Sequence, residues 1–204
     1  MNKIYILILL LSSNFTFAQA DKDSLLAKDA DALIEELRFM HELDQGTRKY
    51  LDYGSFNKSF TDSIERLSRE DIKLAEESLK LSKESSSKIW DNFLNPLDSL
   101  KAERMIEIIE KYGFPSEKRL RKYSDKKIDF SARTILVHTP FSFKEKMIPI
   151  IQREYKAGNL KNQCEYGYLL WHLNGRSDFK YMLENGYEMK KNADGTFELT
   201  HNCE

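Results

Sequence analysis

The sequence predicts a mainly α fold, a single helical domain of about six helices with a small C-terminal β-hairpin. Apolar residues recur every three or four positions over most of residues 22–173, which is the period of an amphipathic helix. In the last stretch, apolar and polar residues instead alternate on either side of residues 192–195. These four residues form a glycine-containing turn of the kind that joins two strands. The chain has 204 residues, enough to bury a hydrophobic core.

The N-terminus is typical of a secretory signal peptide over residues 1–20. A lysine precedes an almost unbroken apolar run at 4–11, and a small-x-small pattern ends at Ala20, where we expect cleavage. The run is too short to span a membrane, and no second one follows. We therefore expect a periplasmic or secreted chain without a transmembrane segment, in which 21–204 form one domain and 185–204 its hairpin and tail.

Helical spacing predicts the elements between these ends. We expect helices over 22–52, 60–94, 100–112, 142–157 and 161–173, a short basic helix and loop within 116–129, and a buried helix rather than a strand in the apolar run 130–139. Asn95-Pro96 is expected to end the second helix, and Gly113 the third.

Composition narrows the class of protein. The formal net charge is −1, and acidic and basic residues are mixed, so we expect no nucleic-acid partner. Cys164 and Cys203 are the only cysteines, too few for a usual structural zinc site. In an oxidising compartment they are candidates for a disulfide that would tie the C-terminus to the last helix, and two unpaired thiols are the alternative.

Charged residues interrupt the apolar face of the first helix. If Leu37 marks the centre of that face, Asp44 and Arg48 lie within about 20° of it and His41 within about 40°, with Gln45 at the edge. Their spacing allows an Asp44–Arg48 ion pair, and buried charges must be paired. One interpretation is a structural pair that holds helices together, and the other is the floor of a polar pocket.

Histidines are the remaining candidates for chemistry. His138 ends an apolar run, and is either a general base or ligand, or a buried neutral side chain bonded to backbone. His172 is expected to pack beside Trp171, and His201 to be solvated near the tail. Their spacing matches no metal motif, and no nucleophile elbow or phosphate loop is present, so we expect neither metal nor cofactor.

Several short motifs, taken in order, resemble a family of exported bacterial domains of unknown function, common in Bacteroidetes-type bacteria. They are 33–40 followed by Asp44-Gln45 and Arg48, then Gly113-Phe114-Pro115, Val137-His138, and Ile148-Pro149-Ile150 with Gly158. In the family these motifs are Asp-Gln-x-x-Arg, Gly-Trp-Pro and Gln-His. The resemblance implies that Asp44, Gln45, Arg48 and His138 lie together, but it implies no activity.

The chain also departs from that family's pattern. Val137 replaces a glutamine, Tyr168-Leu169 stand where the family has Asp-Arg, and 178–180 keep little of a Gln-x-Tyr-Gly-Thr-Gln segment. These differences indicate a divergent member.

Three functions remain open. The first is a non-catalytic periplasmic binding or interaction domain for a small molecule or protein. The second is a hydrolase-like enzyme in which His138 is the acid/base, Asp44 orients it and Arg48 holds an anionic group. The third is an immunity-type partner protein that uses the charged face of 60–94, which is more simply a solvated surface. We expect the first.

Overall fold

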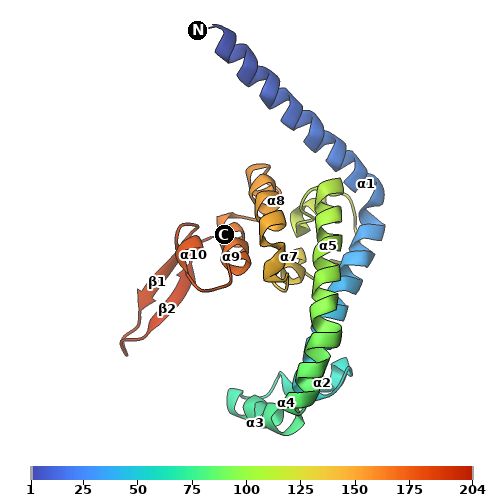
Figure 1. Cartoon of the computed structure of the whole chain (residues 1–204), viewed down its shortest axis with the longest axis vertical. Coiled ribbons are helices and arrows are strands. Elements are labelled where there is room, and N and C mark those ends of the chain that lie inside the picture. The colour runs from blue at the N-terminus through green and yellow to red at the C-terminus, as the bar shows by residue number, and fades with distance from the viewer. Residues whose placement is uncertain (1, 204) are drawn as a thin grey trace.

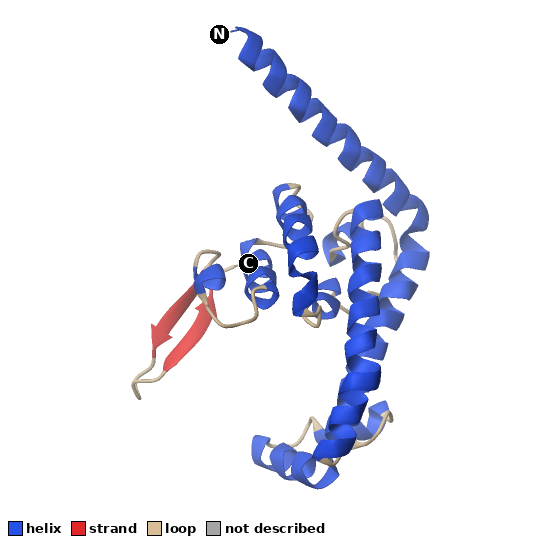
Figure 2. Ribbon diagram, viewed as in Figure 1, coloured by secondary structure: helices blue, strands red, loops and turns tan. Residues whose placement is uncertain are grey.

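The fold is mainly α, as the sequence predicts, with two antiparallel strands at its C-terminal end (Figure 2). A computed structural model describes residues 2–203, with side chains from residue 19 onward. None of the helices in this part of the chain is long and apolar enough to cross a membrane.

Two long helices run side by side in opposite directions, α1 (Asn2–Tyr53) and α5 (Asn95–Tyr112) (Figure 1). Cross-helix ion pairs Glu36–Arg104 and Asp29–Lys111 follow this antiparallel course. Residues 2–20 of the predicted signal peptide form the first part of α1. Most of its side chains lie outside the described residues, so cleavage after Ala20 stays a prediction.

The predicted helix over 60–94 is wrong, because the chain forms several short helices there. They are α2 (Lys58–Ile64), α3 (Arg69–Leu79), α4 (Lys83–Ile89) and the π-helical turn η1 (Trp90–Leu94). The side chains of Ser68 and Ser82 accept hydrogen bonds from the backbone N–H groups of Asp71 and Ser85 and so begin new helices.

The expected stop at Asn95-Pro96 is also wrong. Helix α5 follows η1 directly, and Pro96 lies in its first turn, so the proline starts this helix rather than ending the one before it. Helix α5 does end at Gly113, whose φ of 74° suits glycine.

The second half packs on the α1–α5 pair. It comprises α6 (Glu117–Arg121), α7 (Ala132–Leu136), the 3₁₀ turn η2 (Phe141–Phe143), α8 (Lys144–Lys156), α9 (Gln163–Leu173) and α10 (Lys180–Leu183). The apolar run at 130–139 contains a short helix, as predicted. The largest fully buried core side chains include Leu37, Met105, Phe114, Ile135 and Met147.

The hairpin pairs β1 (Tyr187–Lys191) with β2 (Phe197–His201), from Tyr187 opposite His201 to Lys191 opposite Phe197. Cys164 of α9 and Cys203 form a disulfide that ties the hairpin to the helical body. Gly186 lies against this bond, since a Cβ there would be 2.7 Å from Sγ of Cys203.

Candidate functional site

Three elements bring charged side chains to one buried position. Helix α1 supplies Asp44 and Arg48 from one face, because residues four apart lie one turn from each other. Helix α5 supplies Asp98 and Lys101 from the opposite side. His138 lies two residues after the end of α7, near the end of the apolar run 130–139.

The Asp44 carboxylate is the centre of this cluster and has no exposed surface. Its Oδ1 accepts a bond from the Lys101 ammonium, and its Oδ2 lies 2.7 Å from Nε2 of Gln45. Nδ1 of His138 is 2.8 Å from Oδ2 and 3.0 Å from Oδ1, and Nη2 of Arg48 is 3.4 Å from Oδ1. Every side of the carboxylate is occupied by a donor.

The second acid, Asp98, completes the charge balance. Arg48 donates to both of its oxygens at 2.7 and 2.9 Å, and Nζ of Lys101 is 2.9 Å from Oδ1. The ring of Trp90 covers the guanidinium at 5.3 Å. Two carboxylates therefore face two cations, and the cluster is neutral when His138 is neutral.

Electrostatics keeps Asp44 ionised. Burial acts to raise its pKa, but hydrogen bonds from His138 and Lys101 and the Lys101 charge outweigh that and hold the pKa well below the usual range. The cost of burying the carboxylate is thus offset by its partners.

The backbone on both sides of His138 is held by His172, near the end of α9, and by Arg176, in the turn that follows α9. Nη2 of Arg176 donates to the carbonyl of Val137 at 2.8 Å, and Nε2 of His172 is 3.3 Å from the carbonyl of Thr139. Nε of Arg176 also donates to Nδ1 of His172 at 2.7 Å, so the neutral imidazole carries its proton on Nε2. Burial, together with Arg176, lowers the pKa of His172 to about 4.

The structure brings together the four residues named from the sequence, Asp44, Gln45, Arg48 and His138. His41 makes no hydrogen bond to them, and its buried Nδ1 has no hydrogen-bond partner among the described residues. His172 holds the backbone beside His138 through Thr139, and its expected packing beside Trp171 stays a prediction.

Sequence reasoning missed Lys101 and Asp98. The sequence did contain a signal for them. One face of this helix, formed by positions 98, 101, 105, 108 and 112, is buried and mostly apolar, and both residues lie on it. Placing the start of the helix at residue 100 left Asp98 outside it and made Lys101 a first-turn residue.

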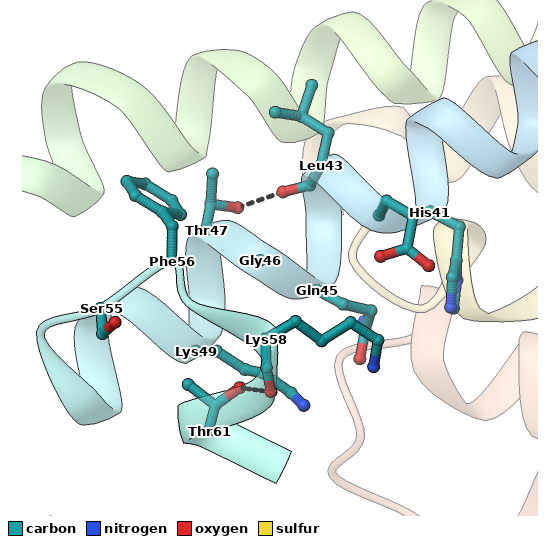
Figure 3. A pocket seen from close by; sticks show the side chains of 11 residues that line it. His41, Leu43, Gln45, Gly46, Thr47, Lys49, Ser55, Phe56, Lys58 and Thr61 are labelled. Carbon is teal, nitrogen blue, oxygen red and sulfur yellow. Dashed lines mark hydrogen bonds between the residues drawn. The ribbon is translucent and has the colours of Figure 1, made fainter.

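A pocket of about 370 Å³ opens next to the cluster, between α1 and the start of α2 (Figure 3). Its lining is His41, Glu42, Leu43, Gln45, Gly46, Thr47, Lys49, Ser55, Phe56, Lys58 and Thr61. Figure 3 shows the side chain of Lys58 extending alongside Gln45. None of Asp44, Arg48 and His138 lines it, and Gln45 is the residue that belongs to both places.

Two lysines give this pocket a cationic side. Lys49 donates to Asp62 and Glu65, and Lys58 donates to Asp62, but neither of those acids lines the pocket. Burial acts to lower the pKa of Lys49, but its bonds to Glu65 and Asp62 raise it overall, so Lys49 is an ammonium ion. The only acidic residue in the lining is Glu42.

The cluster and the pocket differ in what they can do. A histidine whose Nδ1 contacts a buried carboxylate has the arrangement of an oriented base, but Asp44 here is shared among four partners. The pocket has a volume typical of small-ligand sites and donors that face solvent.

Comparison of the chain with protein-family models, with curated proteins and with solved structures finds no match.

Proposed function

We propose that this protein is an exported, non-catalytic binding domain, and that it binds a small carboxylate-bearing molecule in the pocket between α1 and α2. The observation that carries the proposal is the contrast between the two neighbouring sites. Asp44 is saturated by donors and inaccessible, whereas Lys49 and Lys58 line an open pocket and keep N–H groups for a ligand.

Export is supported by two independent features. The first 20 residues have the pattern of a signal peptide, and Cys164 and Cys203 are joined in a disulfide, which persists in oxidising compartments. We further propose, from the order of the motifs, that the chain is a divergent relative of the exported family of unknown function.

Filling the pocket is the most direct test. Gly46 lines it, lies in helical backbone, and a Cβ at that position meets no atom within 4 Å. Gly46→Leu should therefore fold, since leucine also favours a helix, while its side chain occupies the ligand space. Acetate, succinate and glutamate are the probes, titrated into ¹⁵N-labelled protein and followed by NMR shifts.

We expect succinate or glutamate to shift the amides of Gln45, Lys49 and Thr61 with dissociation constants on the order of 1 mM. Gly46→Leu should abolish these shifts. If no carboxylate perturbs the pocket amides of the wild type, or if Gly46→Leu binds equally well, the proposal is wrong.

Charge reversal gives a matched comparison. Lys58 and Lys88 are equally exposed, at 69% and 70%, and each pairs with an acid four residues away. Lys58→Glu should weaken succinate binding at least about tenfold, while Lys88→Glu, outside the pocket, should not change it. Equal effects would mean that only overall charge attracts the anion.

The hydrolase-like enzyme stays a second candidate because of one contact. Nδ1 of His138 lies 2.8 Å from Asp44, its Nε2 has no hydrogen-bond partner among the described residues, and the side chain is 21% exposed. The wild type would then hydrolyse some member of a panel of nitrophenyl esters and phosphoesters, and His138→Ala would abolish that turnover. Turnover that survives His138→Ala excludes this role.

A further inference from the structure

The β-hairpin extends away from the helical body and has free edges. Figure 1 shows β1 as its outer strand, on the side away from the helices. Residues 188–191 of β1 are exposed. A hairpin of two strands is marginally stable alone in water, and this one is anchored at its base by the disulfide.

The hydrogen-bond pattern shows which backbone groups are free at the outer edge. Asn192 donates to Thr196, and Asn202 donates to Gly186 at the two ends of the hairpin. Because bonded pairs alternate in an antiparallel ladder, the bonded residues of β1 are 188 and 190. The N–H and C=O groups of Tyr187, Met189 and Lys191 therefore point outward.

We propose that β1 pairs with β1 of a second copy of this chain, antiparallel and centred on Met189, to form a continuous four-stranded sheet. In this register Met189 exchanges backbone bonds with the other copy's Met189, and Tyr187 pairs with its Lys191. These are the outward-pointing groups, so the two-fold axis and the hydrogen-bond pattern agree.

Charge complementarity argues for a second copy as the occupant. The same register sets Glu188 directly opposite Lys190 of the other copy, twice, at a separation where cross-strand pairs interact. Within its own chain Lys190 stands opposite Glu198, and Glu188 accepts a bond from Asn202 at 3.3 Å. Each Lys190 thus lies between two carboxylates across the completed sheet.

The outer edge of β2 lacks this complementarity. Pairing two copies of β2 about Leu199 would set Glu198 opposite Thr200 and Phe197 opposite His201. The opposite charges therefore favour pairing through β1 and set its antiparallel orientation. Without such complementarity, charged side chains on an exposed edge discourage pairing.

The contact is small. Two five-residue strands bury much less surface than the roughly 1,000 Å² of a stable interface, so we expect half-association at protein concentrations on the order of 10⁻⁴ M. Analytical ultracentrifugation of the protein, expressed from its full sequence with the disulfide intact, measures this. A wild type that stays monomeric at about 1 mM overturns the proposal.

Two proline variants locate the edge. Met189→Pro removes an N–H that points outward and takes no part in the hairpin, so it should abolish dimers while the hairpin persists. Leu199→Pro is the matched control, because it removes the equivalent outward N–H from β2, and its dimer should be unchanged. Dimers that persist in Met189→Pro, or that disappear equally in both variants, contradict the proposed edge.

Charge exchange tests the register. Glu188→Lys and Lys190→Glu each place like charges opposite one another in a homodimer, and each should weaken it at least about tenfold. Mixing the two variants sets every lysine opposite a glutamate of the other chain, so a heterodimer should form with wild-type affinity. Failure to form that heterodimer would refute the register centred on Met189.

Discussion

Replacing Lys101 by methionine should expose the role of the buried charge cluster. The side chain of Lys101 is 4% exposed, and its ammonium contacts both Asp44 and Asp98. Methionine keeps the volume and the helix propensity, so the loss is mainly electrostatic. Two buried carboxylates would then share one permanent cation, Arg48.

The expected cost follows from the burial of that pair. Removing one member of a buried ion pair typically costs 3–5 kcal/mol, and Arg48 still contacts both carboxylates, so we expect about 3 kcal/mol. For a chain of this length, that lowers the melting temperature by about 10 °C. Urea unfolding of the disulfide-intact protein at pH 7 measures the difference.

Lys111→Met is the matched control in the same helix. Lys111 pairs with Asp29, but its side chain is 51% exposed, and exposed ion pairs contribute little. If Lys101→Met destabilises the protein no more than Lys111→Met, the cluster is not a stabilising network and our reasoning fails.

Acid provides a second readout of the same interaction. The pKa of Asp44 is depressed in the folded state, so its stabilising contribution is present above about pH 3.9 and is lost as the pH falls further. Lys101→Met removes one cause of that depression, so the difference in stability between variant and wild type should narrow from pH 7 to pH 3. If the difference in stability between Lys101→Met and the wild type stays constant with pH, the destabilisation comes from lost packing.

Three other changes test the framework around the site. The pKa of His172 is lowered to about 4 in the folded protein, so the unfolded chain binds a proton first as the pH falls. The free energy of unfolding should therefore fall by about 3 kcal/mol between pH 6.5 and pH 4. Urea unfolding should show that His172→Asn flattens this fall. Gly113→Ala places a Cβ 2.7 Å from Arg119 at a φ of 74° and should cost at least about 2 kcal/mol by thermal unfolding, while Gly158→Ala, with similar φ but open space, should cost about 1 kcal/mol. Cys203→Ser removes a cross-link spanning 39 residues and should cost about 4 kcal/mol in chemical denaturation, with a smaller loss indicating residual structure in the unfolded chain.

The first helix could be interpreted correctly because its helical period continues over a long segment. A period of 3.6 residues over 22–52 places Asp44 and Arg48 on the core face without any tertiary information. Asp44 is indeed fully buried, and Arg48 is in contact with it. The position of His138 beside them follows from no local rule, and only the resemblance to a family implied it.

The segment 60–94 shows where periodicity misleads. Its apolar positions continue across two helix starts, yet Leu67 is 49% and Leu74 is 64% exposed. Serines at 68 and 82 compete for backbone N–H groups and break the helix, an effect that a hydrophobic pattern does not register.

A third buried carboxylate had no local signal at all. Glu154 of α8 is 1% exposed, and it accepts bonds from the backbone N–H of Phe114 and from Asn159. Phe114 lies 40 residues away in sequence, in the Gly113-Phe114-Pro115 motif. That motif therefore forms a structural joint between α5 and α8, which explains why a glycine is needed there.

The charge cluster is best understood as the device that sets how α1 and α5 pair. Asp44 meets Lys101 and Arg48 meets Asp98 in only one antiparallel register, and sliding one helix by a turn would break both cross-helix pairs and leave each buried carboxylate with only the cation of its own helix. Gln45 donates to Asp44 and also lines the pocket, so the same register positions one wall of the proposed ligand site. A change at Lys101 should accordingly weaken succinate binding without touching the pocket, whereas a catalytic role for Asp44 predicts no such coupling.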